Sequence, residues 1–388
     1  MNNEMIAKGK KYIMGTYSQA PIVIEKGEGV ILTDNTGKEY IDMVSGIAVN
    51  SLGYGHPAVV KAIQEQAEKL IHISNLYWNV PQIELAEKLC QASGLGKAFF
   101  CNSGAEANES AIKLARKYGS KTGRHTIISM IQSFHGRTMG ALKATGQTKY
   151  QNGFAPLPEG FKYTEANNIE MLDAMIDDDT CAIMLEVIQG EAGIIALDEA
   201  YLKHVEQVCA EKDILFIIDE VQTGVGRTGS LYCYEQYGIE PDVITSAKGL
   251  GGGLPIGACL CASRLGEVLG AGMHGTTFGG NPVSCAGGLE VLQRVAKDSF
   301  LRSVEEKGRY LREKLSKMAG VQELRGLGMM IGIVLAKDNA KEVAGRCVKN
   351  GLLVLTAKHK MRLLPPLNIA QTELEKGLSI LKNTLAAL

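Results

Sequence analysis

A short apolar run in the second half of the chain ends in two acidic residues. Residues Ile214 to Ile218 are all apolar, and the length and branching of the run are typical of a buried strand. Asp219 and Glu220 follow directly. Burying an unpaired carboxylate is costly, so two acids at the end of a buried strand indicate that a partner lies beside them. Any fold of this chain must therefore bring such a partner to the end of this strand.

A second unusual residue, Lys248, lies between a short, mostly apolar run (residues 243–247) and the glycine-rich sequence GLGGGLPIG. Glycines carry no side chain and so allow a ligand to approach closely. A lysine amine can form a Schiff base with an aldehyde cofactor, and an aspartate can keep a pyridinium nitrogen protonated. We therefore interpret Lys248 and Asp219 as the catalytic contacts of pyridoxal 5′-phosphate.

The residue totals restrict the class of protein. A chain of 388 residues is too long for one small core, and an apolar fraction of 45% excludes a disordered protein. Lys and Arg number 41 and Asp and Glu number 42, so no basic excess attracts nucleic acid or an anionic membrane. The seven histidines are far apart and lack metal-binding spacing, so we expect no metal site.

Cysteine usage and the N-terminal sequence favour a cytoplasmic location. The nine cysteines are odd in number and contain no CxxC pair, which indicates reduced thiols. The first residues, MNNEMIAKGKKY, lack the apolar core of a signal peptide. No apolar stretch reaches the length of about 18 residues that a membrane helix needs. We expect a soluble protein with no membrane partner.

Strand and helix patterns alternate from Pro81 to Lys248. The predicted strands cover 98–101, 125–130, 182–185, 214–218 and 243–247, and the predicted helices cover 83–92, 104–118 and 199–211. Strands separated by helices of this length predict a parallel sheet covered on both faces. Ligands bind outside the carboxyl ends of such strands. We therefore expect the polar segments at these ends to meet, namely 103–105, 134–137, 186–191, 219–222 and Lys248.

Two glycine-containing segments have more than one interpretation. Ser103 is a plausible N-cap with Glu106 three residues later, which makes the amides of Gly104 and Ala105 a candidate phosphate site or simply the start of an ordinary capped helix. The segment 224–229 matches GxGxxG, the dinucleotide fingerprint. We disfavour a dinucleotide site because five residues separate the strand from these glycines and no amphipathic helix follows them.

Six motifs occur in order along the chain: SGAEANE, SFHGRT, LEVIQGEAG, DEVQTGVGRTG, SAKGLGGGLPIGA and HGTTFGGNP. Together they resemble the class III (ω-amino-acid) pyridoxal-phosphate aminotransferases of fold type I over essentially the whole chain. The resemblance implies an α/β fold with a large domain, built on a mainly parallel seven-stranded sheet covered by helices, and a smaller α/β domain. It also implies a homodimer with active sites at the subunit interface.

We expect three parts along the chain. Residues 1–50 form an extended N-terminal arm and a hairpin, with its turn at 34–37, and associate with the small domain. Residues 51–290 form the large cofactor-binding domain, and residues 291–388 form the C-terminal small domain.

The resemblance assigns cofactor contacts by position. Lys248 is the Schiff-base lysine and general acid–base, Asp219 pairs with the pyridinium nitrogen, and Gln222 binds the ring hydroxyl. The remaining contacts come from ring-sandwiching side chains, phosphate-binding groups and the acid beside Asp219: Phe134, Val221, Gly104, Ala105, Glu220 and, from the neighbouring subunit, Thr277.

The resemblance also assigns substrate contacts. Arg137 holds the distal carboxylate of the substrate, with Thr276 beside it. Arg362 takes the α-carboxylate of glutamate, and Glu191 holds Arg362 aside when the other substrate binds. Trp78 lies next to Tyr77 in SNLYWN and is a candidate substrate wall.

Within the class, SGIAVNSLGYGHP, SNLYWN and FAPLPEGF are most similar to the acetylornithine aminotransferase subfamily. Ornithine aminotransferases carry a Tyr near Gly46 that contacts a free α-amino group, and Gly46 leaves room for an acylated nitrogen. The expected reaction transfers the terminal amino group of N2-acetyl-L-ornithine to 2-oxoglutarate, giving N-acetyl-L-glutamate 5-semialdehyde and L-glutamate, in arginine biosynthesis. Other ω-aminotransferases, acting on succinyl-diaminopimelate, succinylornithine, ornithine or 4-aminobutyrate, remain open.

Overall fold

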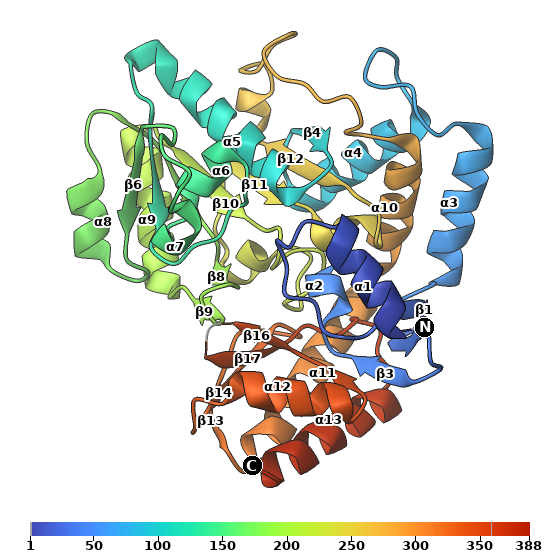
Figure 1. Ribbon diagram of the computed structural model, residues 1–388. Helices are drawn as coiled ribbons and strands as arrows, with labels where there is room; N and C mark the ends of the chain where they lie inside the picture. Colours follow the sequence, from blue (N-terminus) through green and yellow to red (C-terminus); the bar gives the residue numbers. More distant parts are fainter. Residues whose placement is uncertain (1, 358) are drawn as a thin grey trace.

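The computed structural model describes residues 2–357 and 359–388 (Figure 1). Its helices are α1 (Asn2–Tyr12), α2 (Ser45–Ala48), α3 (Pro57–Lys69), α4 (Val80–Ser93), α5 (Gly104–Gly119), α6 (Met139–Ala144), α7 (Thr148–Gln151), α8 (Ile169–Met175), α9 (Glu199–Lys212), α10 (Pro282–Val295), α11 (Asp298–Ser316), α12 (Ala340–Lys349) and α13 (Gln371–Ala386). Its strands are β1 (Ile24–Glu28), β2 (Ile31–Asp34), β3 (Glu39–Asp42), β4 (Lys97–Cys101), β5 (Thr126–Met130), β6 (Phe161–Thr164), β7 (Thr180–Leu185), β8 (Ile188–Gln189), β9 (Ile195–Ala196), β10 (Leu215–Asp219), β11 (Val243–Ser246), β12 (Gly257–Cys261), β13 (Val321–Arg325), β14 (Ile331–Leu335), β15 (Leu352–Leu353), β16 (Leu355–Ala357) and β17 (Lys360–Leu363).

A seven-stranded sheet forms the centre of the upper part of the molecule in Figure 1. The strand order is β4-β12-β11-β10-β7-β5-β6, and only β12 runs antiparallel to its neighbours. The expected fold, with a mainly parallel seven-stranded sheet, is confirmed. The strands and helices predicted between Pro81 and Lys248 all form, with ends within three residues of the expected ones.

Strand β10 illustrates that the sheet is covered on both faces. All five of its residues are buried. Because successive side chains of a strand point to opposite faces, Leu215 and Ile217 join the core beneath α5, whereas Phe216 and Ile218 join the core on the opposite face. A strand that is buried on both faces reads as a continuous apolar run rather than an alternating one.

The two ends of the chain share a second core. This core combines Val30, Ile41 and Met43 with residues from α11 to α13 and from strands β14 and β17. One sheet has the order β13-β14-β17-β16, and β15 adds in parallel to β3 in the sheet β1-β2-β3-β15. In Figure 1 these elements form the lower part of the molecule. The predicted hairpin around residues 34–37 is confirmed as β2 and β3.

The expected extended arm at the N-terminus is wrong over residues 2–12, which form helix α1; Met1 lies outside the described residues. Most of the described α1 side chains are exposed, so the sequence carries no apolar stripe to reveal the helix. Local effects nonetheless favour it. Glu4 lies in the first turn and pairs with Lys8 at 3.0 Å, and lysines fill the last turn.

A buried arginine, Arg227, joins the two cores. Its side chain is 1% exposed and donates to the carbonyls of Met329 (3.2 Å) and Pro365 (2.6 Å) and to Ser45 Oγ (3.4 Å). Burial lowers the pKa of Arg227 to about 9. It lies within the GxGxxG match, whose last glycine packs so closely that a Cβ there would lie 2.6 Å from Glu305 on α11. These glycines thus serve helix packing, which agrees with our rejection of a dinucleotide site.

Among the described residues, no helix combines the length and the apolar character needed to cross a bilayer.

We expect Arg227→Met to lower stability markedly. The substitution leaves two buried carbonyls without their donors, which costs about 2 kcal/mol in total. The check is the midpoint of urea unfolding, with Arg302→Met on the exposed surface of α11 as the matched control. Equal midpoints for the two variants would show that Arg227 does not join the cores.

Candidate active site

A cavity of about 420 Å³ lies where the strands β4, β7, β10 and β11 end. Residues from all five expected segments line it, together with a wall from Gly253 to Ile256 and one residue, Val49, from the N-terminal part. The predicted cofactor residues that line the cavity are Gly104, Ala105, Phe134, Asp219, Val221, Gln222 and Lys248. The polar segments at the ends of the strands therefore meet in one cavity, as expected from the sequence.

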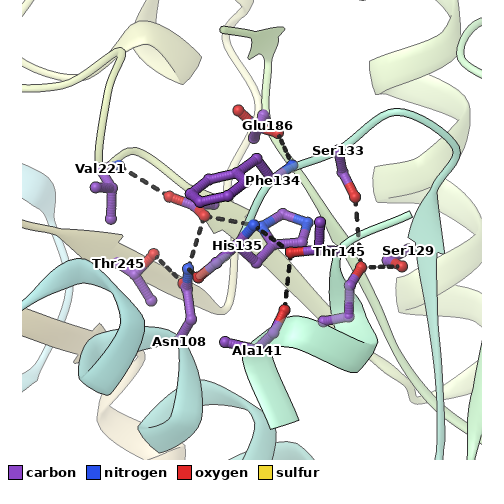
Figure 2. Close-up of polar contacts among 12 residues, drawn as sticks. Asn108, Ser129, Ser133, Phe134, His135, Ala141, Thr145, Glu186, Val221 and Thr245 are labelled. Atoms are coloured by element: carbon purple, nitrogen blue, oxygen red, sulfur yellow. Dashed lines mark hydrogen bonds and ion pairs between the residues drawn. The ribbon is translucent and has the colours of Figure 1, made fainter. Parts of the chain in front are cut away.

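Asp219 is the last residue of β10 and is 4% exposed. Its Oδ2 accepts from Asn108 Nδ2 and lies 2.8 Å from His135 Nδ1, while its Oδ1 accepts from the amide of Val221 at 2.9 Å. Figure 2 shows Asn108, His135 and Val221, which bind this carboxylate, entering the site from separate segments. The partner that we expected for this acid from the sequence is thus a set of three groups: the side chains of Asn108 and His135 and the amide of Val221.

The two side chains that hold Asp219 are themselves held. Asn108 Oδ1 accepts from Thr245 Oγ1 at 2.7 Å, and Asn108 Nδ2 also donates to the carbonyl of His135. The amide of His135 donates to Thr145 Oγ1 at 2.9 Å (Figure 2). Burial alone would lower the pKa of His135, but the hydrogen bond and charge of Asp219 outweigh it and raise that pKa. A raised pKa favours the imidazolium, which complements a buried carboxylate.

Lys248 begins a 3₁₀ turn directly after β11 and has a φ of 40°. A left-handed lysine backbone is strained, and such strain is concentrated at functional sites. Burial lowers the pKa of the Lys248 amine, and the charge of Arg362 adds to this, against the raising effect of Glu191 and Asp219. The result is an amine that gives up its proton more readily than a surface lysine.

The start of α5 forms a close-fitting edge of the cavity. Ser103 caps the helix by accepting from the amide of Glu106 at 3.2 Å, as the sequence predicts. The Glu106 carboxylate reaches back to the amide of Asn102 (2.6 Å). A Cβ on Gly104 would lie 2.7 Å from Val221, so this position needs glycine. The amides that remain at the helix N-terminus suit an anion.

Glu186, at the end of β7, is buried behind Phe134. Its carboxylate accepts from the amides of Phe134 (2.9 Å) and Gly190 (3.3 Å). Burial raises the pKa of Glu186 to about 7. Figure 2 shows that the hydrogen bond to the Phe134 amide fixes the backbone of the phenylalanine that lines the cavity.

Arg362 reaches the cavity from β17, in the second core. Its Nη1 donates to Glu191 Oε1 at 2.7 Å, to Gln222 Oε1 at 3.1 Å and to the carbonyl of Gly190 at 3.1 Å. Burial alone would raise the pKa of Glu191, but the Arg362 charge outweighs it and lowers that pKa. The predicted Glu191–Arg362 pair is present and closed in this structure.

The structure places the other predicted residues at or outside the rim. Arg137 is exposed and lines the cavity, and Thr276 Oγ1 accepts from Asn102 Nδ2 at 3.2 Å. Thr277 is exposed in the loop before α10, and Trp78 is 87% exposed beside a separate hollow between α3 and α4.

Glu220 is not brought into the cavity. Its carboxylate accepts from Thr223 Oγ1 and the amide of Tyr234, and burial raises its pKa to about 7. Asp219 and Glu220 are neighbours on extended chain, so their side chains point in opposite directions.

Three residues that hold Asp219 and His135 in place were not predicted from the sequence: Asn108, Thr145 and Thr245. Asn108 lies one turn into α5, on the side that faces β10 and β11. An asparagine four residues after Gly104, and therefore on the same face of the predicted helix, was the available signal.

The residues present fit pyridoxal 5′-phosphate. A half-buried amine with a lowered pKa suits the aldehyde, and a buried carboxylate held by Asn108 and His135 suits the pyridinium nitrogen. A glycine-fronted helix N-terminus suits the phosphate. Phe134 and Val221 offer apolar surface on the cavity walls.

The family model named aminotransferase class-III matches residues 12–385. An acetylornithine aminotransferase of Caldanaerobacter subterraneus subsp. tengcongensis is 53% identical, covering 98% of this chain and 99% of that protein. The crystal structure of N-acetylornithine aminotransferase from Stenotrophomonas maltophilia K279a matches with a TM-score of 0.85 at 36% identity, over 98% of each chain. The ornithine aminotransferase from Toxoplasma gondii ME49 matches with a TM-score of 0.94 at 30% identity, over 100% of this chain and 95% of that one. The chain therefore belongs to the class-III aminotransferases, enzymes that depend on pyridoxal 5′-phosphate.

Proposed function

We propose that this enzyme transfers the terminal amino group of N2-acetyl-L-ornithine to 2-oxoglutarate, yielding N-acetyl-L-glutamate 5-semialdehyde and L-glutamate, as a step of arginine biosynthesis. The observation that carries the proposal is that Glu191, which lines the same cavity as Lys248 and Asp219, is paired with Arg362. The name of the 53% identical relative supports the choice of donor.

Each group of the cavity has a part in this reaction. When bound, pyridoxal 5′-phosphate supplies an electron-withdrawing ring that stabilises negative charge at the substrate carbon. Lys248 accepts and returns the proton of that carbon, and its lowered pKa favours the neutral amine that a base needs. Asp219 presents its carboxylate to the ring nitrogen, and Gln222 binds the ring hydroxyl.

The remaining contacts are assigned by their place around the cavity. Phe134 and Val221 flank the ring, and the amides of Gly104 and Ala105 bind the phosphate together with Thr277 of the neighbouring subunit. Glu220 has no place in this proposal, because its side chain points away from the cavity and binds Thr223 and the amide of Tyr234. Arg137 binds the distal carboxylate of the substrate, with Thr276 beside it. Trp78 lies outside this cavity of its own chain, on the surface proposed below as the subunit interface, so a role as a substrate wall requires the dimer.

One cavity must accept two different substrates in turn. The donor brings a long amine, whereas 2-oxoglutarate brings a second carboxylate close to the reacting carbon. With Glu191 paired to Arg362, the charge of Arg362 is neutralised when the first substrate binds, and Arg137 is left as the arginine that binds its carboxylate. Breaking a buried ion pair with no replacement costs about 3–5 kcal/mol, so the incoming carboxylate must take the place of Glu191.

We also propose that the enzyme is a homodimer. The loops 70–79 and 271–281 project from the same end of the molecule in Figure 1 and are tied by Asn75, which donates to the carbonyls of Thr276 and Gly279. The exposed apolar side chains of this surface are Ile71, Leu76, Tyr77, Trp78, Val80, Met273 and Phe278. Such a patch is typical of an interface, and Thr277 lies within it.

Two further parts of the proposal concern organisation. We propose that residues 1–50 act with the small domain of residues 291–388, and that residues 51–290 form the large domain; the shared second core supports this, with the boundary falling inside α10. A cytoplasmic location is supported by nine free cysteines.

The substrate assignment is tested with a panel of acetylornithine, succinylornithine, ornithine and 4-aminobutyrate, each with 2-oxoglutarate. We expect the highest kcat/KM with acetylornithine, because Gly46 leaves room for an acylated nitrogen. Ornithine is the informative competitor, since a solved structure of that activity matches the whole chain. Lys248→Ala is the control and should lack both turnover and the visible absorbance of bound cofactor. A preference for ornithine would overturn the substrate assignment.

We expect Glu191→Gln to shift the enzyme toward glutamate. A neutral amide holds Arg362 less firmly than a carboxylate, by about 1.4 kcal/mol, which corresponds to about a tenfold change. The ratio of kcat/KM for glutamate to that for acetylornithine should rise by this factor. Glu170→Gln on the exposed face of α8 is the matched control. An unchanged ratio would contradict the proposal that the Glu191–Arg362 pair switches the cavity between the two substrates.

The dimer is tested by placing a charge in its proposed surface. We expect the wild type to sediment at twice the mass of one chain, and Leu76→Glu to sediment as a monomer, because an unpaired charge is costly at a buried interface. Ile169→Glu, at an exposed apolar position on α8, is the control and should remain a dimer. A monomeric wild type would contradict the proposal.

A further inference from the structure

Arg137, at the rim of the cavity, lies against an aromatic ring that no site assignment includes. Its guanidinium carbon is 4.2 Å from the centroid of the Tyr150 ring, well within the range of a cation–π contact, and 5.6 Å from that of Phe134. The Phe134 and Tyr150 rings meet edge to face, with centroids 5.7 Å apart and an interplanar angle of 78°. The three side chains therefore form a continuous set from the cavity wall to its rim.

The backbone that carries Tyr150 is firmly attached. Tyr150 lies on α7, and the next residue, Gln151, donates from Nε2 to the carbonyls of Thr145 (2.8 Å) and Leu142 (3.3 Å). The start of α6, which follows Arg137 in the chain, is held as well: Glu109 Oε1 accepts from the amides of Gly140 and Ala141, each at 2.9 Å. The backbone between Arg137 and Tyr150 is therefore fixed at both α6 and α7, which sets the position of the ring relative to the arginine.

Arg137 needs such a support more than Arg362 does. Arg362 is 3% exposed and bound to three oxygens, whereas Arg137 is exposed and, in the described part of the chain, forms no ion pair. An unrestrained arginine loses up to about 2 kcal/mol of side-chain entropy when a ligand orders it. A ring that holds the guanidinium before binding removes part of that cost.

A cation–π contact is compatible with carboxylate binding by the same guanidinium. A guanidinium stacks on an aromatic ring through its flat face, while its N–H donors lie in its plane and point outward. Tyr150 can therefore hold Arg137 without using the N–H fork that binds a carboxylate.

We propose that Tyr150 is a positioning residue for carboxylate recognition: its ring pre-orients Arg137 toward the cavity. The inference deepens the proposed function, since it relies on Arg137 binding the distal carboxylate of the substrate. It gives Tyr150 no contact with the reacting atoms, so its loss weakens substrate binding and leaves the chemical step intact.

The first test compares Tyr150→Leu with Tyr150→Phe in the cofactor-loaded enzyme. Leucine removes the π face and keeps much of the apolar volume, so we expect the KM for acetylornithine to rise about two- to fivefold at an unchanged kcat. Phenylalanine keeps the face and should restore the wild-type KM. A KM for Tyr150→Phe as high as that for Tyr150→Leu would overturn the proposal, because the hydroxyl rather than the ring would then matter.

The second test asks whether Tyr150 acts through Arg137. Tyr150→Leu is measured in the wild-type and in the Arg137→Leu backgrounds, which completes a double-mutant cycle. We expect the two- to fivefold effect to vanish once Arg137 is absent. The same loss of kcat/KM in both backgrounds would show a general structural role for Tyr150 and would overturn the proposal.

The two proposals fail in different ways. If the wild type preferred another ω-amino acid, the proposed donor would be wrong, and the cycle run with that preferred substrate would still measure the coupling between Tyr150 and Arg137. If acetylornithine were the preferred donor and the cycle showed no coupling, only the inference about Tyr150 would fall.

Discussion

The buried carboxylate of Asp219 constrains the rest of this structure. A carboxylate that is 4% exposed loses its hydration and must recover that free energy from protein donors. Its donors come from α5 (Asn108), from the loop after β5 (His135) and from the turn that follows β10 (Val221). Satisfying one acid therefore fixes the positions of three segments, of which α5 contributes a residue 111 positions before Asp219. The same three segments form the walls of the cavity, so the fold and the cofactor site are specified by one set of contacts.

The charges around this carboxylate are balanced locally rather than by a field of the whole protein. Lys248 lines the cavity together with Asp219, Glu191 and Glu186, and Arg362 pairs with Glu191 at its edge. Burial pushes Lys248, Glu191 and Glu186 toward their neutral forms, and the neighbouring charges decide the outcome: the charge of Arg362 lowers the pKa of Glu191, whereas the pKa of Glu186 is raised to about 7. An amine with a lowered pKa results at the position where the chemistry needs a base.

The sequence predicts those features that one element determines by itself. The run 214–218 predicts its own burial, and Ser103 predicts the start of α5. Features that depend on distant partners are less visible. The role of Asn108 depends on Asp219 and Thr245, which no local pattern connects to it. Helix α1 was missed for the opposite reason: it is stabilised by local charges and buries little, so it leaves no periodic apolar signal.

Glu220 shows that neighbouring residues of one motif can lie on different sides of the chain. It shares the DEVQTG motif with Asp219, yet the alternation of side chains along extended chain sends it to the opposite side, against Thr223 and Tyr234. A resemblance identifies the segment that binds a cofactor, whereas the period of the strand decides which member of the segment can touch it.

Substrate exchange requires cooperation between the two cores. Lys248 belongs to the sheet of the first core, and Arg362 enters the cavity from β17 of the second. Their relative position therefore depends on how the cores are joined, and the buried guanidinium of Arg227 makes that connection through the carbonyls of Met329 and Pro365. Pro365 lies three residues beyond Arg362, and Arg227 lies five beyond Gln222, which itself binds Arg362. Two loops are thus tied at two points, one inside the cavity and one beneath it. Arg362, which must be released from Glu191 for the second substrate, is therefore carried by a backbone that is held close to it, and its release is a movement of side chains.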